Sequence, residues 1–362
     1  MTSFSQIISR PQLVYLVFGA PTYHQEAVFS IASALAQLGK TTDLPFDIQV
    51  FSDDPEPYRE LPVRVRPIDS DLRRQWSGPY HYQFRCKHVV ARKVLQESQT
   101  AILIDTDTFF HDSPMKLFER VQPDTLLCNA FQLRYEDCKE TVLYTALAQT
   151  LARRELADDQ MRLINSGVIG LTHDNTSVLD KSIALMDEFF PVTPGAVTLE
   201  EFCLGVAAYR SLKVEQCTDV IHHYWSRKQL FRAKVRAWLN KHGENPLSTD
   251  ALRDTGNVSP RVPRPSTWQR LMYKTATLAV PPAQRQFIRE VLYGCCEYPN
   301  EFDRACSPVW WEKAFANAQR RLKKPIEPAQ LHQWLEHWAV RRLLGRRRVA
   351  IYQHLVQAQT SR

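Results

Sequence analysis

The segment Ala101-Ile-Leu-Ile-Asp-Thr-Asp-Thr-Phe-Phe110 places two aspartates directly after a short apolar run. Residues 101–104 are apolar and bounded by polar residues, which is typical of a buried β-strand. Asp105 and Asp107 follow, and side chains two residues apart on an extended chain point to the same side. Carboxylates favour hard divalent cations such as Mg²⁺ or Mn²⁺. The segment therefore predicts a metal site at the end of a strand, with a solvated turn as the alternative.

The residues around this strand alternate between short apolar runs and helical patterns, as in an α/β sheet protein. The expected elements are strands over 13–18, 47–51, 166–171 and 220–225, and helices over 25–38 and 82–96. Ligands of open α/β sheets bind outside the carboxyl ends of the strands. The polar residues at these strand ends are therefore the first candidates for a binding site.

The pattern becomes helical after residue 228. Phe231, Val235, Trp238 and Leu239 recur at the spacing of one helical face, and a Pro-rich break follows at 259–265. Further helices are expected over 268–278, 283–293, 308–322 and 328–357. This change of pattern predicts an α/β domain over residues 1–228 and a helical domain over residues 229–362.

Charge changes sign at about the same place. Residues 1–225 carry 21 Lys and Arg against 29 Asp and Glu, whereas residues 226–362 carry 25 against 10. The balances are therefore −8 and +15, and six of the eight tryptophans lie in the basic part. Two functional regions are expected from this asymmetry.

Three interpretations apply to the basic, Trp-rich region. Basic amphipathic helices with tryptophan suit an anionic membrane surface, and the apolar stripe 231–239 and the run 341–348 fit that picture. Clusters of Lys and Arg with aromatic residues also suit nucleic acid. We favour a membrane surface or a lipid-linked acceptor, keep an ordinary helical domain with a solvated basic surface as the alternative, and disfavour nucleic acid.

The sequence also bears on location. The longest N-terminal apolar run, 13–18, is far shorter than a spanning helix and lacks the flanks of a signal peptide. Eight cysteines are scattered without a C-x-x-C pair, as expected for thiols in a reducing compartment. We therefore expect a cytoplasmic protein, peripheral at the inner face of the membrane if its basic region binds lipid.

Several segments, taken in order, resemble those of GT-A glycosyltransferases, most of all the group that contains glycogenin and the bacterial lipopolysaccharide galactosyltransferases. Residues 101–109 resemble the family's DxD strand. The other matching segments are 18–23 for the nucleoside-binding opening, 50–53 for the second strand, the helix with Arg85 and Lys87, 164–169 for the Asn-x-Gly strand beside the transferred sugar, and 220–225 with Lys228 for the histidine and lysine element. The likeness covers about residues 13–228.

The resemblance implies a GT-A type, Rossmann-like mixed sheet flanked by helices, with a catalytic domain over 1–228 that binds a nucleotide-sugar. It implies a metal-dependent hexosyltransferase with Mn²⁺ or Mg²⁺ as cofactor. The donor would be a nucleotide-diphosphate sugar, UDP-sugar by preference, and the acceptor a hydroxyl of a glycan, a lipid-linked saccharide or a protein. The rival enzymes are a nucleotidyltransferase or a phosphatase that uses the same aspartates, although Phe109 stands where such phosphatases carry Thr or Val. The non-enzymatic alternative is a nucleic-acid-binding protein.

The resemblance also implies roles for particular residues. The metal ligands would be Asp105, Asp107 and one of His222 and His223. A cation on the diphosphate would stabilise the leaving group, and Lys228 with Lys87 or Arg85 would add charge-assisted hydrogen bonds. The expected donor-binding residues are Ala20, Thr22, Tyr23, Asp53, Lys87, Thr106, Asn165, Ser166, Gly167 and Lys228.

Glu200 and Glu201 are the expected catalytic residues. An inverting enzyme needs a carboxylate base near the acceptor hydroxyl, and a retaining enzyme needs a group on the opposite face of the sugar. Either glutamate could serve in either mechanism. A capping role at the start of the following helix is an equally good interpretation of the same residues.

Only one of His222 and His223 should bind the metal, because adjacent residues on a strand point to opposite faces. Spacing to Lys228 favours His222, and the aromatic residue that follows favours His223. Separate alanine substitutions should give one severe and one mild loss of Mn²⁺ affinity in a direct titration. Two equally mild losses would remove both histidines from the site.

Overall fold

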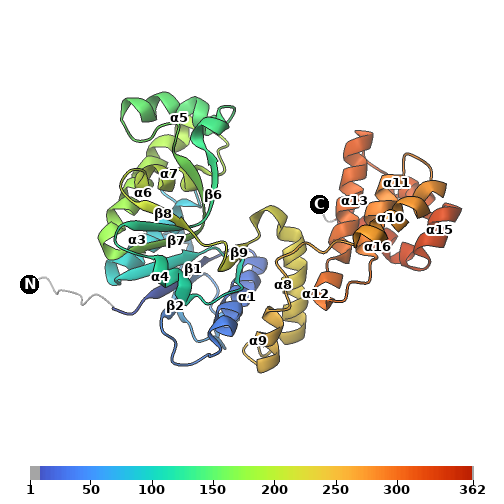
Figure 1. Cartoon of the computed structure of the whole chain (residues 1–362), viewed down its shortest axis with the longest axis horizontal. Coiled ribbons are helices and arrows are strands. Elements are labelled where there is room, and N and C mark those ends of the chain that lie inside the picture. Colours follow the sequence, from blue (N-terminus) through green and yellow to red (C-terminus); the bar gives the residue numbers. More distant parts are fainter. Residues whose placement is uncertain (1–8, 361–362) are drawn as a thin grey trace, which may run out of the picture. The chain divides into compact units, whose positions relative to one another are not determined.

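The computed structural model describes residues 9–360, and the chain divides into two compact units (Figure 1). The first unit comprises Met1–Trp225 with Glu244–Thr255, and the second comprises Ser226–Gly243 with Gly256–Arg362. The chain returns to the first unit because α9 (Thr249–Thr255) packs against α1 (Pro21–Leu38).

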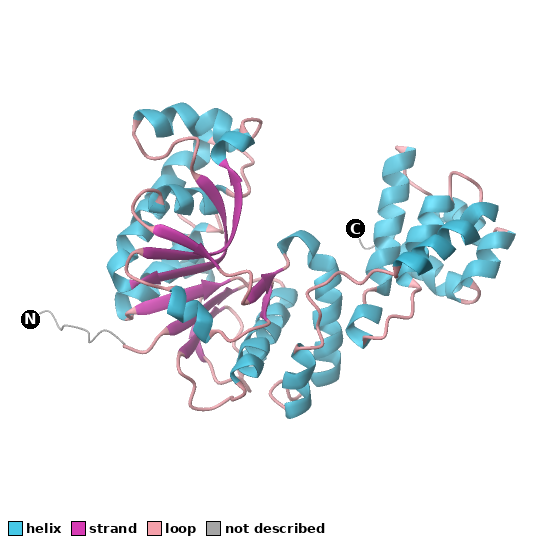
Figure 2. Ribbon diagram, viewed as in Figure 1, coloured by secondary structure: helices cyan, strands magenta, loops and turns pink. Residues whose placement is uncertain are grey.

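A seven-stranded sheet forms the centre of the first unit, with helices on both of its faces (Figure 2). The strand order is β3-β2-β1-β4-β7-β6-β8, and β7 is the only one of these strands that runs antiparallel to its neighbours. The mixed α/β class predicted from the sequence is therefore confirmed. The strands are β1 (Gln12–Val17), β2 (Asp47–Ser52), β3 (Arg64–Pro67), β4 (Thr100–Ile104), β6 (Thr125–Arg134), β7 (Arg162–Thr172) and β8 (Lys213–Gln216).

The helices of the first unit bury the apolar strands from both sides. Residues 101–104 of β4 are all buried, as expected for a strand covered on two faces. Helix α1 begins at Pro21, four residues earlier than expected, because proline suits the first turn of a helix. The remaining helices are α2 (Ser70–Trp76), α3 (Arg85–Glu97), α4 (Met115–Arg120), α5 (Val142–Arg153), α6 (Thr176–Phe189) and α7 (Leu199–Ala208).

A second, two-stranded sheet lies at the edge where β4 ends. Strand β5 (Thr108–Phe110) pairs antiparallel with β9 (Ile221–His223). Thr108 lies opposite His223, and Phe109 lies opposite His222. This register brings residue 223 next to Asp107, although 116 residues separate the two in the sequence.

The second unit is helical, as expected. One expectation about it is wrong: residues 328–357 do not form a single helix. The chain breaks at His337, which is extended (φ −57°, ψ 135°), and at Gly345, whose positive φ of 53° suits glycine. These breaks let Val340 and Ile351 reach one shared core. The helices are α8 (Lys228–His242), α10 (Thr267–Ala276), α11 (Arg285–Gly294), α12 (Glu301–Arg304), α13 (Ser307–Leu322), α14 (Pro328–Glu336), α15 (Trp338–Leu344) and α16 (Arg347–Thr360).

Three of the four residues of the apolar stripe of α8 are buried, and Leu239 is half-buried. Phe231 and Val235 are each 2% exposed and Trp238 is fully buried. The stripe is therefore unavailable as the membrane-facing surface that the sequence suggested. Within residues 9–360 no helix has the length and apolar character needed to cross a bilayer.

Lys234 gives a test of this packing. It is fully buried, lies 2.7 Å from Asp303, and donates to the carbonyls of Ser259 and Arg261, both at 2.9 Å. Lys234→Ala should destabilise the second unit by about 3–5 kcal/mol, because it leaves a carboxylate and two carbonyls without their partner.

The matched control is Lys241→Ala, which removes an exposed ion pair with Glu301 and should cost about 0–1 kcal/mol. Denaturant unfolding followed by tryptophan fluorescence measures both variants. Similar small losses in the two would contradict the structural role of Lys234.

Candidate functional site

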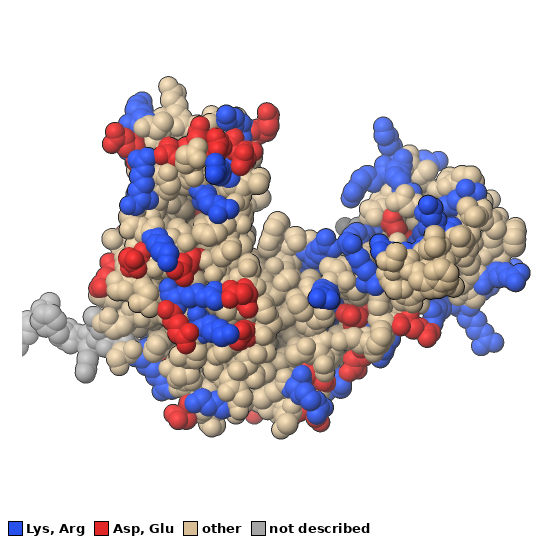
Figure 3. All heavy atoms as spheres, in the orientation of Figure 1, with Lys and Arg blue, Asp and Glu red and all other residues tan. Residues whose placement is uncertain are grey.

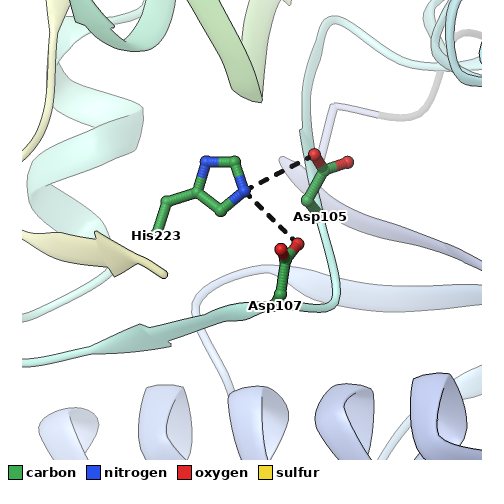
Figure 4. A group of neighbouring side chains, drawn as sticks. All are labelled: Asp105, Asp107 and His223. Carbon is green, nitrogen blue, oxygen red and sulfur yellow. Dashed lines mark ion pairs between the residues drawn. The ribbon is translucent and has the colours of Figure 1, made fainter. Parts of the chain in front are cut away.

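Three side chains that commonly bind metals meet at the carboxyl end of β4 (Figure 4). Asp105 follows β4, Asp107 precedes β5, and His223 ends β9. The Nε2 atom of His223 lies 3.3 Å from an oxygen of Asp107 and 3.9 Å from an oxygen of Asp105. One ligand atom from each residue lies within 4.8 Å of the others. Two carboxylates and an imidazole at this spacing fit one divalent cation.

Backbone hydrogen bonds fix the positions of the two aspartates. The Asp105 amide donates to the carbonyl of Gly167 in β7 at 2.9 Å. The Tyr224 amide, one residue after β9, donates to the carbonyl of Asp107 at 3.0 Å. The backbone of both aspartates is thus tied to the neighbouring strands.

Asn165 determines the tautomer of His223. Its Oδ1 atom accepts from the Gly167 amide at 3.1 Å and lies 2.8 Å from His223 Nδ1, while its Nδ2 donates to Glu201 at 3.0 Å. Because Oδ1 is an acceptor, Nδ1 must carry the proton. In the neutral ring Nε2 then presents a lone pair to two carboxylates. That arrangement is repulsive unless a cation lies between them or Nε2 is protonated, so the donor set fits a metal.

Gly167 makes room for this histidine. A Cβ atom at position 167 would lie 2.2 Å from His223 Nδ1, far inside van der Waals contact. The glycine of the Asn-Ser-Gly segment is therefore required by the imidazole, and by no special backbone angle.

His222 faces elsewhere. Its ring packs against Phe109, with 5.2 Å between the ring centroids. The alternation of side chains along β9 accounts for the separation of the two histidines. The structure thus brings His223, and not His222, to the two aspartates.

Lys87 lies beneath the aspartates, on α3, and is only 7% exposed. Its ammonium lies 2.9 Å from Asp105, 3.1 Å from both the carbonyl and the hydroxyl of Ser166, and 3.0 Å from Glu200. Burial alone would lower the pKa of Lys87, but the carboxylates of Asp105 and Glu200 outweigh it and raise the pKa. The lysine is therefore charged, and its donors are already engaged by protein oxygens. Arg85 is engaged too, in a two-point ion pair with Asp187.

Glu200 and Glu201 stand in the first turn of α7 and bond to different partners. Glu200 is 2% exposed and accepts from Lys87 and from the Ser166 hydroxyl at 2.7 Å. Glu201 accepts from Asn165 and from Gln132 at 3.3 Å. Neither side chain caps the helix, because each carboxylate is turned to β7 or β6.

Burial raises the pKa of both glutamates. For Glu200 the charge of Lys87 opposes the effect of burial. For Glu201 the neighbouring charge of Glu200 adds to burial and raises the pKa to about 7. Glu201 can therefore gain or lose a proton near neutral pH, as a general acid or base requires.

Asp53 connects the segments that the sequence analysis expected to bind the nucleoside. Its carboxylate accepts from the amide of Gly19 at 2.9 Å and lies 3.3 Å from His24 Nε2. It thus ties the end of β2 to the turn after β1, beside the end of β4. Of the other expected donor-binding residues, the structure places Ala20, Thr22 and Tyr23 at the start of α1, Thr106 between the two aspartates, and Lys228 at the start of α8 in the second unit.

Sequence reasoning missed several residues of this region. Gln132 contacts Glu201 from β6, a strand that the sequence pattern did not predict. Tyr82 accepts from the Glu200 amide at 3.1 Å and belongs to an aromatic cluster. Nothing in the local sequence marks these residues, since their partners lie far along the chain. The cluster is Tyr80, Tyr82, Phe84 and Phe190, with ring centroids 5.1–5.7 Å apart, and Tyr80 and Phe84 are exposed.

No known family model and no curated protein sequence matches this chain. Among solved structures, the galactosyltransferase LgtC in complex with donor and acceptor sugar analogs is similar at 11% identity and a TM-score of 0.38, covering 56% of this chain and 72% of that one. Mouse xyloside xylosyltransferase 1 in its apo form is similar at 13% identity and a TM-score of 0.39, covering 57% and 85%. Likeness at this distance carries no functional argument, so the case rests on the chemistry of the site.

Glu201 makes the stability of the metal-free protein depend on pH. Its pKa of about 7 lies above the ordinary value of 4.5, so the folded state binds this proton more tightly than the unfolded state does. Stability should therefore fall as pH rises from about 4.5 to 7. The Glu201→Gln variant should lose less unfolding free energy over this pH range than the native chain does. The difference between the two losses should be on the order of 1 kcal/mol or more. Denaturant midpoints at both pH values, with chelator present, measure the effect, and identical pH dependence in the two proteins would contradict it.

Proposed function

We propose that this chain is a glycosyltransferase that depends on a divalent metal and takes its sugar from a nucleotide-diphosphate donor. The observation that carries the proposal is the Asp105, Asp107 and His223 cluster, with a histidine lone pair directed at two carboxylates. A divalent cation held there supplies Lewis-acid stabilisation of a diphosphate leaving group. Mn²⁺ and Mg²⁺ are the candidate ions, and UDP-sugars are the first donors to test.

The donor would lie along the carboxyl edge of β2, β1 and β4. We assign the nucleoside to the turn at Gly19 and Ala20 and to Asp53, and the diphosphate to the metal centre. Thr22, Tyr23 and Thr106 border this edge. Adjacent parallel strands with polar ends are the usual place for such a ligand. The phosphate contact expected of Lys228 stays a prediction.

Lys87 receives a different role from the one expected. Its ammonium is surrounded by oxygens of Asp105, Ser166 and Glu200, which leaves no donor for a phosphate. We assign it to holding Asp105 in its ligand position and to balancing the negative charge of the site. Asn165 and Gly167 position His223, and Ser166 bonds to Lys87 and Glu200. We assign the transferred sugar to this edge of β7.

The reacting sugar would lie beside α7. Glu200 is paired with Lys87 and is assigned a positioning role, whereas Glu201, with its pKa of about 7, is the candidate acid or base. Both stereochemical outcomes remain compatible with it. The exposed rings of Tyr80 and Phe84 would suit the apolar face of an acceptor sugar. The acceptor class is a glycan, a lipid-linked saccharide or a protein, and the cytoplasmic location expected from the sequence stays a prediction.

The first experiment is a thermal-shift panel of nucleotides and nucleotide-sugars with Mn²⁺ and with chelator. A rise in melting temperature that needs both a UDP-sugar and the metal supports the proposal. Stabilisation by nucleoside triphosphates, with release of pyrophosphate, would indicate a nucleotidyltransferase instead. Release of inorganic phosphate from a phosphoester would indicate a phosphatase.

Asp105→Asn and Asp107→Asn should each lower the rate of UDP release from the donor by roughly a hundredfold or more, because an amide keeps the size but removes the charge from the metal. The control is Asp112→Asn, an aspartate near the end of β5 that pairs with Lys116 on the surface. Circular dichroism should show all three folded. Near-normal turnover in both site variants would refute the metal assignment.

A further inference from the structure

Helix α10 (Thr267–Ala276) is exposed to an unusual degree for an amphipathic helix. None of its ten residues is buried. Trp268 is 68% exposed, Leu271 51% and Met272 50%, and Leu278 in the turn that follows is 60% exposed. An exposed group of large apolar side chains of this kind marks an interaction surface.

The apolar side chains share one face of the helix. At about 100° per residue, Trp268, Leu271 and Met272 fall within about 100° of arc. The adjacent arc packs on the second unit through Tyr273, which joins the core there and lies 6.3 Å from Tyr293, ring to ring. Arg270 falls on the side away from the apolar face. The helix therefore has a packed arc, an apolar arc and a basic arc.

Both ends of α10 are held in place by contacts with neighbouring residues. Ser266 and Gln269 form a capping box at the first turn, with hydrogen bonds of 2.8 and 3.2 Å. At the other end Thr277 and Val280 are each 1% exposed. The outward face of α10 is thus exposed although both ends of the helix are held by contacts within the second unit.

The charge around this face has one sign. Residues 256–289 contain six Lys and Arg and no Asp or Glu. The exposed cations Arg264, Arg270 and Lys274 form no ion pair with any residue in 9–360. The whole second unit carries 24 Lys and Arg against seven Asp and Glu, a balance of +17, and Figure 3 shows Lys and Arg spread over it.

We propose that α10 is a membrane-docking helix that lays Trp268, Leu271, Met272 and Leu278 into the interface of a bilayer rich in anionic lipid, with Arg264 and Lys274 as the cations for the headgroups. A tryptophan on the apolar face and cations beside it are the features of a helix that lies in the interface plane. This surface replaces the buried stripe of α8 that the sequence suggested.

The same features disfavour other occupants. A nucleic acid offers anions but no apolar surface to receive Trp268, Leu271 and Met272. A second copy of this chain would bring two sets of unpaired cations together. An anionic bilayer offers both the apolar layer and the negative charge, and its attraction falls off within a Debye length.

The test is sedimentation of the full-length chain with phosphatidylcholine vesicles that are rich in phosphatidylglycerol. Binding should appear at low ionic strength, weaken in high salt, and be absent with phosphatidylcholine alone. The double variant Leu271→Glu, Met272→Glu should bind roughly tenfold more weakly or worse. Arg264→Gln with Lys274→Gln should weaken binding by roughly tenfold. All of these positions are exposed, so circular dichroism and melting temperature should not change.

The control is Val197→Glu, which adds one glutamate at a 76% exposed apolar residue of the first unit. It should bind vesicles normally. Vesicles should also shift tryptophan emission to the blue, and the shift should disappear in Trp268→Phe but persist in Trp338→Phe, which changes another exposed tryptophan of the second unit.

Four results would overturn the proposal. The first is that the native chain does not bind anionic vesicles at low salt, and the second is that Val197→Glu loses as much binding as the double variant. The third is an emission shift that depends on Trp338 instead of Trp268. The fourth is that duplex DNA displaces the chain completely from vesicles and also binds the Leu271→Glu, Met272→Glu variant as tightly as the native chain. A dimer in light scattering that the same double variant dissociates would assign the face to self-association.

Discussion

The ammonium of Lys87 lies almost completely buried among oxygens of Asp105, Ser166 and Glu200, which come from the end of β4, from β7 and from α7. Desolvating these charges is costly, and only their mutual attraction and complete hydrogen bonding offset the cost. Loss of Lys87 would leave the carboxylates of Asp105 and Glu200 next to each other without a counter-charge. Helix α7, the edge of β7 and the carboxylate of Asp105 are therefore held together by a single cation.

Asn165 supplies the second constraint, because its amide group links Glu201 to His223, the candidate metal ligand. Its NH₂ donates to Glu201, which forces its oxygen toward His223 and Gly167. A flipped amide would place two donors against the Gly167 amide and His223 Nδ1–H. The orientation of the imidazole thus depends on an acceptor at residue 201, and this coupling follows from donor and acceptor chemistry alone.

The sequence predicted the parts of this site that depend on near neighbours. Asp105 and Asp107 are two residues apart on an extended segment, and their shared direction needs no knowledge of the fold. The choice between His222 and His223 depends on the register of β5 against β9, which no local pattern contains. The engagement of Lys87 likewise depends on Glu200, 113 residues away. The prediction of one long helix over 328–357 was wrong because the helical spacing of apolar residues continues past Gly345, although the backbone changes direction there.

The contrast between α8 and α10 shows what amphipathicity can and cannot predict. Both helices have an apolar face and basic residues, yet Trp238 is fully buried and Trp268 is 68% exposed. A sequence pattern identifies an apolar helix face, but it does not show whether that face is buried against the rest of the protein. Arg264, just before α10, and Lys274 within it form no ion pair with any described residue. These cations and the exposed apolar face beside them can both be satisfied by a partner that supplies negative charge and an apolar layer. An anionic bilayer supplies both.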